Sequence, residues 1–172
     1  MQNIEFKAEL RDLPAARQQC QTLGAVEAGR FEQVDTYFRL TDGRLKRRES
    51  TGEPTQWIFY HRPDRARPRM SNFSILSDEE ARRRWGTHSL TEWLRVTKTR
   101  ELWMLDSVRI HLDLVNRLGT FIEFEAPVSK TRSVERCHEE IAVLRKTFMP
   151  ILGEPVSASY SDLMALDPAS ST

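Results

Sequence analysis

The feature that most limits the fold of this 172-residue chain is a strict two-residue alternation near its start. In residues 3–10, apolar side chains occupy every second position and polar side chains occupy the positions between them. This period is typical of a β-strand, because successive side chains of a strand point to opposite faces of its sheet. Further stretches of strand character lie at 32–40, 44–49, 55–62, 71–76, 95–104, 107–114 and 119–126.

Helical signals are fewer. Asp12 is the predicted N-cap of a first helix, which runs to Leu23 and ends at Gly24. Ser77 and Glu80 have the spacing of a capping box, which predicts a short helix directly after them. The other helical segments are expected at 88–94, 133–148 and 159–166.

This order of elements predicts an α+β domain whose antiparallel strands form one large sheet, curled or closed on itself. The length is typical of one domain, which we place at residues 1–166. The Ser-rich end, residues 167–172, is expected to be a disordered tail.

The expected setting is the cytoplasm. The start has no apolar run typical of a secretory signal, and no stretch approaches the ~18 apolar residues of a membrane span. Cys20 and Cys137 lie far apart in the sequence and indicate neither a disulfide framework nor a metal motif.

The net charge argues against one broad class of function. The chain has 26 basic and 25 acidic residues, which gives a formal charge of +1. Generic binders of nucleic acids or anionic membranes usually carry a large basic excess. Of the 26 bases, however, 21 are arginines, whose planar guanidinium suits phosphate and carboxylate groups.

Fixed charges occupy the polar faces of the predicted strands, where uncharged polar residues would be sufficient for contact with water. Period-two spacing puts these residues on such faces: Glu5, Lys7, Arg44, Lys46, Arg48, Lys98, Arg100, Arg109, His111, Asp113, Glu123 and Glu125. One interpretation is a solvated sheet with cross-strand ion pairs. The other is a barrel that encloses these groups and needs a ligand to balance them. In such a barrel the cations would bind a polyanion, and the carboxylates a divalent ion such as Mg²⁺ or Mn²⁺.

Six short motifs, in order along the chain, resemble those of the CYTH domains, the triphosphate tunnel metalloenzymes. They lie at 3–7 (NIEFK), 35–38 (DTYF), 44–49 (RLKRRE), 98–101 (KTRE), 121–125 (FIEFE) and 159–163 (SYSDL). The likeness covers residues 3–165 and is closest to the class IV adenylate cyclase-like branch. It implies an eight-stranded antiparallel closed tunnel barrel with flanking helices, in which a triphosphate binds with one or two divalent metal ions.

The resemblance also implies roles for individual residues. The implied metal ligands, for Mg²⁺ or Mn²⁺, are Glu5, Asp113, Glu123 and Glu125. The implied phosphate contacts are Lys7, Arg44, Lys46, Arg48, Arg62, Lys98, Arg100 and Arg109. The expected catalytic groups among them are Glu5, Lys7, Lys98 and Arg100.

The chain departs from the family pattern at two points. The first Glu of the N-terminal signature is Asn3, whose amide brings no negative charge, so one metal ion would bind more weakly. His61 stands where this branch often has a base, and the sequence leaves open whether His61 or Arg62 faces the lumen. We expect His61 on the surface or in packing rather than in a catalytic role. The arginine-rich loop at 63–70 is expected to be exposed.

Three functions stay open. The first is an enzyme acting on a triphosphate, either a class IV adenylate cyclase that makes cyclic AMP and pyrophosphate, or a phosphatase of tripolyphosphate, thiamine triphosphate or a nucleotide. The second, suggested by Asn3, is a non-catalytic triphosphate or polyphosphate binder. The third, suggested by the arginine excess, is an RNA-binding module with salt-sensitive affinity. We favour the first, with a small triphosphate as partner, without nucleic acid or membrane, and with a homodimer left open.

Overall fold

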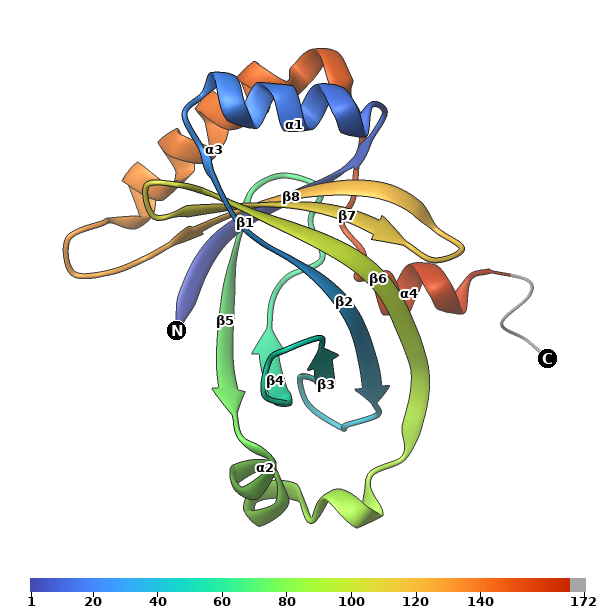
Figure 1. Ribbon diagram of the computed structural model, residues 1–172. Helices are drawn as coiled ribbons and strands as arrows, with labels where there is room; N and C mark the ends of the chain where they lie inside the picture. The colour runs from blue at the N-terminus through green and yellow to red at the C-terminus, as the bar shows by residue number, and fades with distance from the viewer. Residues whose placement is uncertain (168–172) are drawn as a thin grey trace.

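The computed structural model describes residues 1–167, and its strands close into a barrel (Figure 1). The barrel strands are β1 (Gln2–Leu10), β2 (Val26–Phe38), β3 (Arg44–Ser50), β4 (Gln56–His61), β5 (Arg69–Leu76), β6 (Glu92–Leu105), β7 (Val108–Val115) and β8 (Gly119–Pro127). The other elements are α1 (Leu13–Thr22), α2 (Asp78–Trp85), α3 (Val134–Phe148), a short strand β9 (Leu152–Pro155) and α4 (Tyr160–Ala165).

The strands run antiparallel, and β1 closes the barrel. The order around the wall is β5-β4-β3-β2-β6-β7-β8-β1. Residues 2–5 of β1 pair with β5, and residues 3–9 pair with β8. At its far end β1 also pairs with β9, through Ala8 and Leu10. The eight-stranded closed barrel predicted from the sequence is confirmed, and β9 is an unpredicted four-residue addition outside the closed ring.

The apolar face of the barrel wall points outward, against helices. Ile4, Phe6, Ala8 and Leu10 of β1 are buried in a core shared with α1 and α3. Figure 1 shows both helices across the same side of the barrel. Full burial of one large apolar side chain contributes roughly 1.5–3 kcal/mol to the stability of the folded state. The main hydrophobic core therefore lies outside the barrel, and the lumen is left to polar side chains.

The helix α4 closes one end of the barrel. Its Tyr160 and Met164 pack with Tyr37, Val96, Val115 and Phe121. These four residues lie near the late ends of β2 and β7 and the early ends of β6 and β8. Antiparallel pairing brings those ends together, so α4 covers a single opening.

The secondary structure differs from the prediction in a few places. The helix expected at 88–94 is wrong, because a 3₁₀ turn occupies Thr87–Ser89 and β6 begins at Glu92. The β-branched and aromatic residues of this stretch favour a strand. The strand β2 begins at Val26 rather than residue 32, and β5 begins within the expected loop, at Arg69.

The helices expected near both termini, after Ser77 and at 133–148 are confirmed within a few residues. The Ser77–Glu80 capping box forms as predicted. No helix in residues 1–167 has the length and apolar character needed to cross a membrane. Apart from Asp167, the expected tail lies outside the described residues.

Candidate functional site

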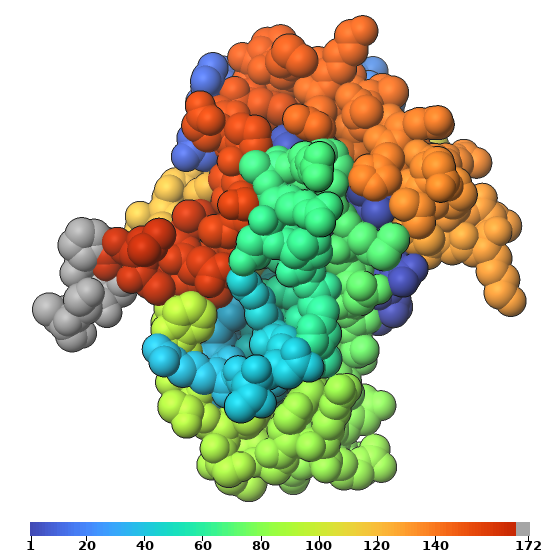
Figure 2. Space-filling view, turned by 180° about the vertical axis from the view of Figure 1, so that it is seen from behind, coloured from blue at the N-terminus to red at the C-terminus, as the bar shows by residue number. Residues whose placement is uncertain are grey.

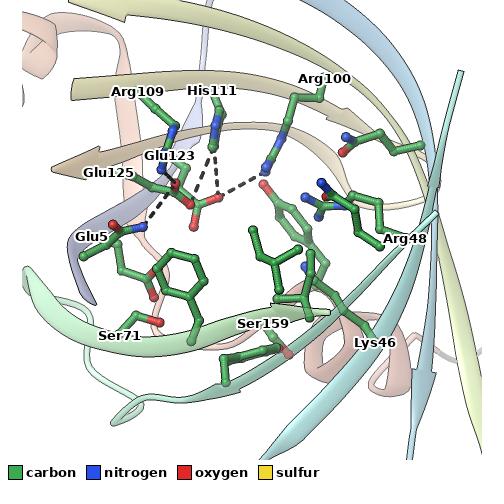
Figure 3. A pocket seen from close by; sticks show the side chains of 18 of the residues that line it. Glu5, Lys46, Arg48, Ser71, Arg100, Arg109, His111, Glu123, Glu125 and Ser159 are labelled. Carbon is green, nitrogen blue, oxygen red and sulfur yellow. Dashed lines mark hydrogen bonds and ion pairs between the residues drawn. The ribbon is translucent and has the colours of Figure 1, made fainter. Parts of the chain in front are cut away.

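Side chains from all eight barrel strands line a cavity of about 410 Å³ in the lumen (Figure 3). Its cations are Lys7, Lys46, Arg48, Arg62, Lys98, Arg100 and Arg109. Lys98 is among the largest fully enclosed side chains of the described residues, with 2% of its surface exposed. Buried cations are costly unless anions balance them, so the acidic partners define this site.

One wall of the lumen carries a cluster of two carboxylates and one imidazole, from Glu123, Glu125 and His111. The pairing of β7 with β8 sets His111 opposite Glu123, and Glu125 follows on the same face two residues later. The Nδ1 atom of His111 lies 3.7 Å from Oε2 of Glu123 and 3.9 Å from Oε1 of Glu125. Figure 3 shows the three side chains converging, and their donor atoms lie within 4.8 Å of one another.

This group fits a divalent metal ion. Carboxylate oxygens and an imidazole nitrogen are common ligands of such ions. Nδ1 of His111 is buried and has no hydrogen-bond partner among the described residues, which leaves it available as a ligand. Asn3, which replaces the first glutamate of the signature, donates its amide to Oε2 of Glu125 at 3.5 Å. Asn3 therefore supports Glu125 through a hydrogen bond but, unlike a glutamate at this position, adds no negative charge for a metal ion.

Neighbouring cations keep Glu123 ionised. Nζ of Lys7 lies 3.7 Å from Oε1, and Nη2 of Arg100 lies 3.1 Å from Oε2. Burial alone would raise the pKa of Glu123, but Lys7, the neighbouring imidazole of His111 and Arg100 together hold this pKa well below its ordinary value. The wall therefore offers an anionic carboxylate over the neutral pH range.

Asp35 of β2 gathers three cations on the other side of the lumen. Arg48 donates two hydrogen bonds to its carboxylate, both of 2.7 Å. Lys46 and Lys98 donate to Oδ2 at 3.1 and 2.9 Å. Burial alone would raise the pKa of Asp35, but the three cations hold it well below its ordinary value. One fully buried carboxylate thus fixes cations from β3 and β6 along the cavity.

Arg100 bridges the two sides of the lumen. It donates to Asp113 at 2.7 and 2.6 Å and to Glu123 at 3.1 Å. The hydroxyl of Tyr160, from α4, donates to Asp113 at 2.7 Å. Asp113 is completely buried and does not line the cavity, contrary to the metal-ligand role expected for it. Its two oxygens are used to orient Arg100 and Tyr160.

Glu5 faces two arginines. Arg62 donates to its Oε1 at 2.7 Å, and Arg69 donates to the same oxygen at 3.3 Å. Glu5 lies opposite Glu125 in the β1–β8 register, but it is not one of the three converging donors. Arg69 is 4% exposed, so the expectation of an exposed loop is wrong for this residue. The neighbouring His61 points outward, as expected.

Arg44 holds α4 in place and does not line the cavity. It donates to Oγ of Ser159 at 2.9 Å and to Asp162 at 2.6 Å, and it pairs with Asp64 at 3.1 Å. Figure 2 shows the result from behind, with α4 in red against the green segment after β4. In this structure Arg44 therefore contacts α4, outside the cavity that the other predicted phosphate contacts line.

The lumen thus collects ten of the twelve residues named from the sequence, all except Arg44 and Asp113. Sequence reasoning missed Asp35 and Arg69 as members of the site, and it placed His111 on the charged inner face without assigning it a ligand role. Period-two spacing put His111 on the inner face, but it carried no sign that Nδ1 would lack a partner. Arg69 lay in an apparent loop, so no strand period indicated its direction.

The end of the lumen opposite α4 is partly apolar. Its lining includes Phe31 of β2, Ile58 of β4, Phe73 and Ile75 of β5, and Leu102 of β6. They lie toward the early ends of β2 and β4 and the late ends of β5 and β6, which the antiparallel order puts at one opening. The cavity therefore runs from a charged interior to an apolar mouth.

The family model of the CYTH domain matches residues 1–150. Among curated proteins, no significant relative is found. The PH1012 protein of Pyrococcus horikoshii has a similar structure, with a TM-score of 0.74, 20% identity, and coverage of 94% of this chain and 98% of that one.

Two further structures carry functional descriptions. A Vibrio parahaemolyticus protein, described as a candidate adenylate cyclase, has a TM-score of 0.75 at 17% identity, with coverage of 95% and 97%. HpAC1 of Hippeastrum, described as a candidate adenylyl cyclase with a dominant triphosphatase activity, has a TM-score of 0.66 at 14% identity and covers 98% of both chains. At these identities the likeness shows a shared fold.

Proposed function

Because this chain belongs to the CYTH domain family, whose members bind triphosphates and depend on metal ions, we propose that it is an enzyme that acts on a triphosphate in the lumen. The observation that carries this proposal is the combination of seven lumen cations with a separate group of metal-ligand type. A triphosphate with a divalent ion needs both features at once.

The cations would bind and orient the phosphoryl oxygens. Arg48 and Lys98 are already held at fixed positions by Asp35, and Arg100 by Asp113. Such preorganised donors stabilise charge that develops during phosphoryl transfer without further reorganisation. Because side chains such as Lys98 and Arg100 are buried, these interactions are stronger than they would be at the surface.

His111, Glu123 and Glu125 would hold the metal ion. When bound, such an ion supplies charge neutralisation and polarisation of phosphoryl oxygens. The part of this chain is to keep Glu123 ionised through Lys7 and Arg100 and to support Glu125 through Asn3 and Arg109. Mg²⁺ and Mn²⁺ are the expected ions.

The first candidate reaction is the adenylate cyclase reaction. In it the ribose 3′-oxygen forms a bond to the α-phosphorus, the bond from that phosphorus to the bridging oxygen breaks, and pyrophosphate leaves while the hydroxyl proton is released. The apolar mouth formed by Phe31, Phe73 and Leu102 supports an organic triphosphate, because it offers contact surface for a nucleobase next to the cations. The leaving pyrophosphate would stay among the cations of the closed interior.

Hydrolysis of a triphosphate is the second candidate. The same cations and ligands serve an attack of water on the terminal phosphorus, which releases orthophosphate. The activity described for HpAC1, a similar structure over its whole length, favours keeping this candidate. The two reactions differ in which phosphorus lies next to the nucleophile.

Product identification tests the proposal. The protein is incubated with ATP, tripolyphosphate or thiamine triphosphate together with Mg²⁺ or Mn²⁺, and the products are assigned by ³¹P NMR and chromatography. Cyclic AMP with pyrophosphate indicates the cyclase, and orthophosphate indicates the phosphatase. Tight binding with none of these products would contradict the enzyme and support the binding module. Binding only to RNA, with steep loss in salt, would contradict the triphosphate site.

Triphosphate affinity should fall as the pH rises through the range of the Lys46 amine. Burial lowers the pKa of Lys46 to about 8, with a further contribution from Arg48, while Asp35 opposes the shift. Above this pH the amine is neutral, so one charge-assisted contact is lost and the affinity should fall roughly tenfold by pH 9. Titration calorimetry with tripolyphosphate from pH 7 to 9 measures this loss.

The free energy of unfolding of the unliganded protein should instead rise with pH over the same range. The unfolded chain keeps the lysine proton up to its ordinary pKa of ~10.4. The free energy of unfolding should therefore gain a contribution between pH 8 and 10, because only the unfolded state stays charged. A Lys46→Arg variant should lose the share of both pH effects that Lys46 contributes, whereas the shares of Lys7 and Lys98, whose pKa values burial also lowers, remain. An unchanged affinity profile in the wild type would contradict the placement of Lys46 in the binding site.

A further inference from the structure

We propose that Nδ1 of His111 is itself a metal ligand and that the lumen therefore selects Mn²⁺ over Mg²⁺. This inference rests on the proposed function for the presence of a metal ion in the lumen, but it concerns which atoms bind it. Three observations support it, namely an unpartnered nitrogen, the carboxylate oxygens that face it, and the charges around them.

The first observation is the state of the imidazole. His111 is 5% exposed, and Nδ1 has no hydrogen-bond partner among the described residues. A buried polar atom without a partner is destabilising, so such atoms usually have a function or an additional partner. A metal ion would satisfy this nitrogen.

The second observation is the direction of the carboxylates. Oε2 of Glu123 and Oε1 of Glu125 face Nδ1 at 3.7 and 3.9 Å. These distances are too long for hydrogen bonds, but they are close to the ~3 Å that separates adjacent ligands of an octahedral ion with bonds of about 2.1 Å. Small side-chain movements would bring the three atoms to ligand positions.

The third observation is which carboxylate oxygens the surrounding cations contact. Arg109 and Asn3 both donate to Oε2 of Glu125, which leaves its Oε1 toward His111. Arg100 shares Oε2 of Glu123 at 3.1 Å, and Lys7 lies near its Oε1. Arg109 therefore contacts the Glu125 oxygen that faces away from His111, whereas Arg100 contacts the Glu123 oxygen that faces it. No lysine or arginine among the described residues pairs with Oε1 of Glu125.

An imidazole nitrogen changes the metal preference. Mg²⁺ is a hard ion that favours oxygen ligands and retains its waters, whereas imidazole favours transition-metal ions. Mn²⁺ accepts both carboxylate and imidazole ligands and is similar to Mg²⁺ in its octahedral geometry. One nitrogen among oxygens therefore favours Mn²⁺ without excluding Mg²⁺.

The test measures metal binding without substrate. Mn²⁺ and Mg²⁺ are titrated by calorimetry into the wild type, His111→Ala and a matched control, His61→Gln, whose imidazole is exposed and outside the lumen. We expect His111→Ala to weaken Mn²⁺ binding at least ~10-fold and Mg²⁺ binding less than about threefold, with no change in the control. Equal losses for both ions would overturn the proposal.

Pulsed electron paramagnetic resonance of Mn²⁺ in the wild type gives an answer that does not depend on the variant folding. A nitrogen-14 coupling typical of directly bound imidazole is expected, and its absence would overturn the proposal. If this coupling appears but no triphosphate is turned over, the ligand assignment stands and the proposed function fails. If turnover occurs without the coupling, the enzyme stands and the assignment to His111 fails.

Discussion

Replacing Glu123 by Gln should lower metal-dependent turnover at least ~100-fold while the protein remains folded. Glu123 contacts the imidazole of His111 and, through its two oxygens, Lys7 and Arg100. The amide keeps the shape but removes the charge, so the ion loses a ligand and both cations lose their anion. The measurement is the initial rate with ATP or tripolyphosphate at saturating Mn²⁺, together with circular dichroism of the variant.

Glu101→Gln is the matched control for this variant. Glu101 is a buried carboxylate on the outer face of β6, where it accepts hydrogen bonds from Arg17 at 2.5 to 3.1 Å. Its loss should also lower stability, but the rate should stay within about twofold, because the residue is outside the lumen. Full activity of Glu123→Gln, or an equal loss in both variants, would contradict the site assignment.

Asp35→Asn should destabilise the unliganded protein by about 3 kcal/mol or more. The substitution leaves Arg48, Lys46 and Lys98 buried around a neutral amide. Removing one partner of a buried ion pair is costly because the remaining charge has no compensation. Chemical denaturation of the variant and the wild type measures this difference.

Tripolyphosphate should recover much of the stability lost in Asp35→Asn. If the three cations line the phosphate site, the bound anion takes over part of the role of the missing carboxylate. The increase in melting temperature on adding tripolyphosphate should therefore be larger in Asp35→Asn than in the wild type. Glu101→Gln, whose unpaired Arg17 lies outside the lumen, should show no such extra recovery. An equal ligand shift in all three proteins would place phosphate binding elsewhere.

The barrel could be predicted from the sequence because its rule is local. Each strand alternates apolar and polar residues, and charges at period two in residues 3–7, 44–48 and 121–125 indicated which face would turn inward. Burial of Ile4 and Phe6 under α1 and α3 agrees with that rule. The strand β9 was not predictable in this way, because four residues with a Gly and a Pro carry no period.

The internal pairing of the charges could not be predicted. Spacing tells which residues share a face, but register and side-chain direction decide which cation meets which anion. Asp113 and Arg44 show this: both have the right spacing, yet one orients Arg100 and the other clamps α4. His111 is the opposite case, since its inward direction was readable but its free Nδ1 depends on the positions of Glu123 and Glu125.

The most direct test of a metal-bound triphosphate in the lumen is anomalous diffraction at the manganese edge from crystals grown with Mn²⁺ and tripolyphosphate. We expect a manganese peak in the lumen beside Glu123 and Glu125, with triphosphate density in contact with Arg48, Lys98 and Arg100. Triphosphate bound only at surface arginines such as Arg65 and Arg67, with no manganese in the lumen, would contradict this expectation.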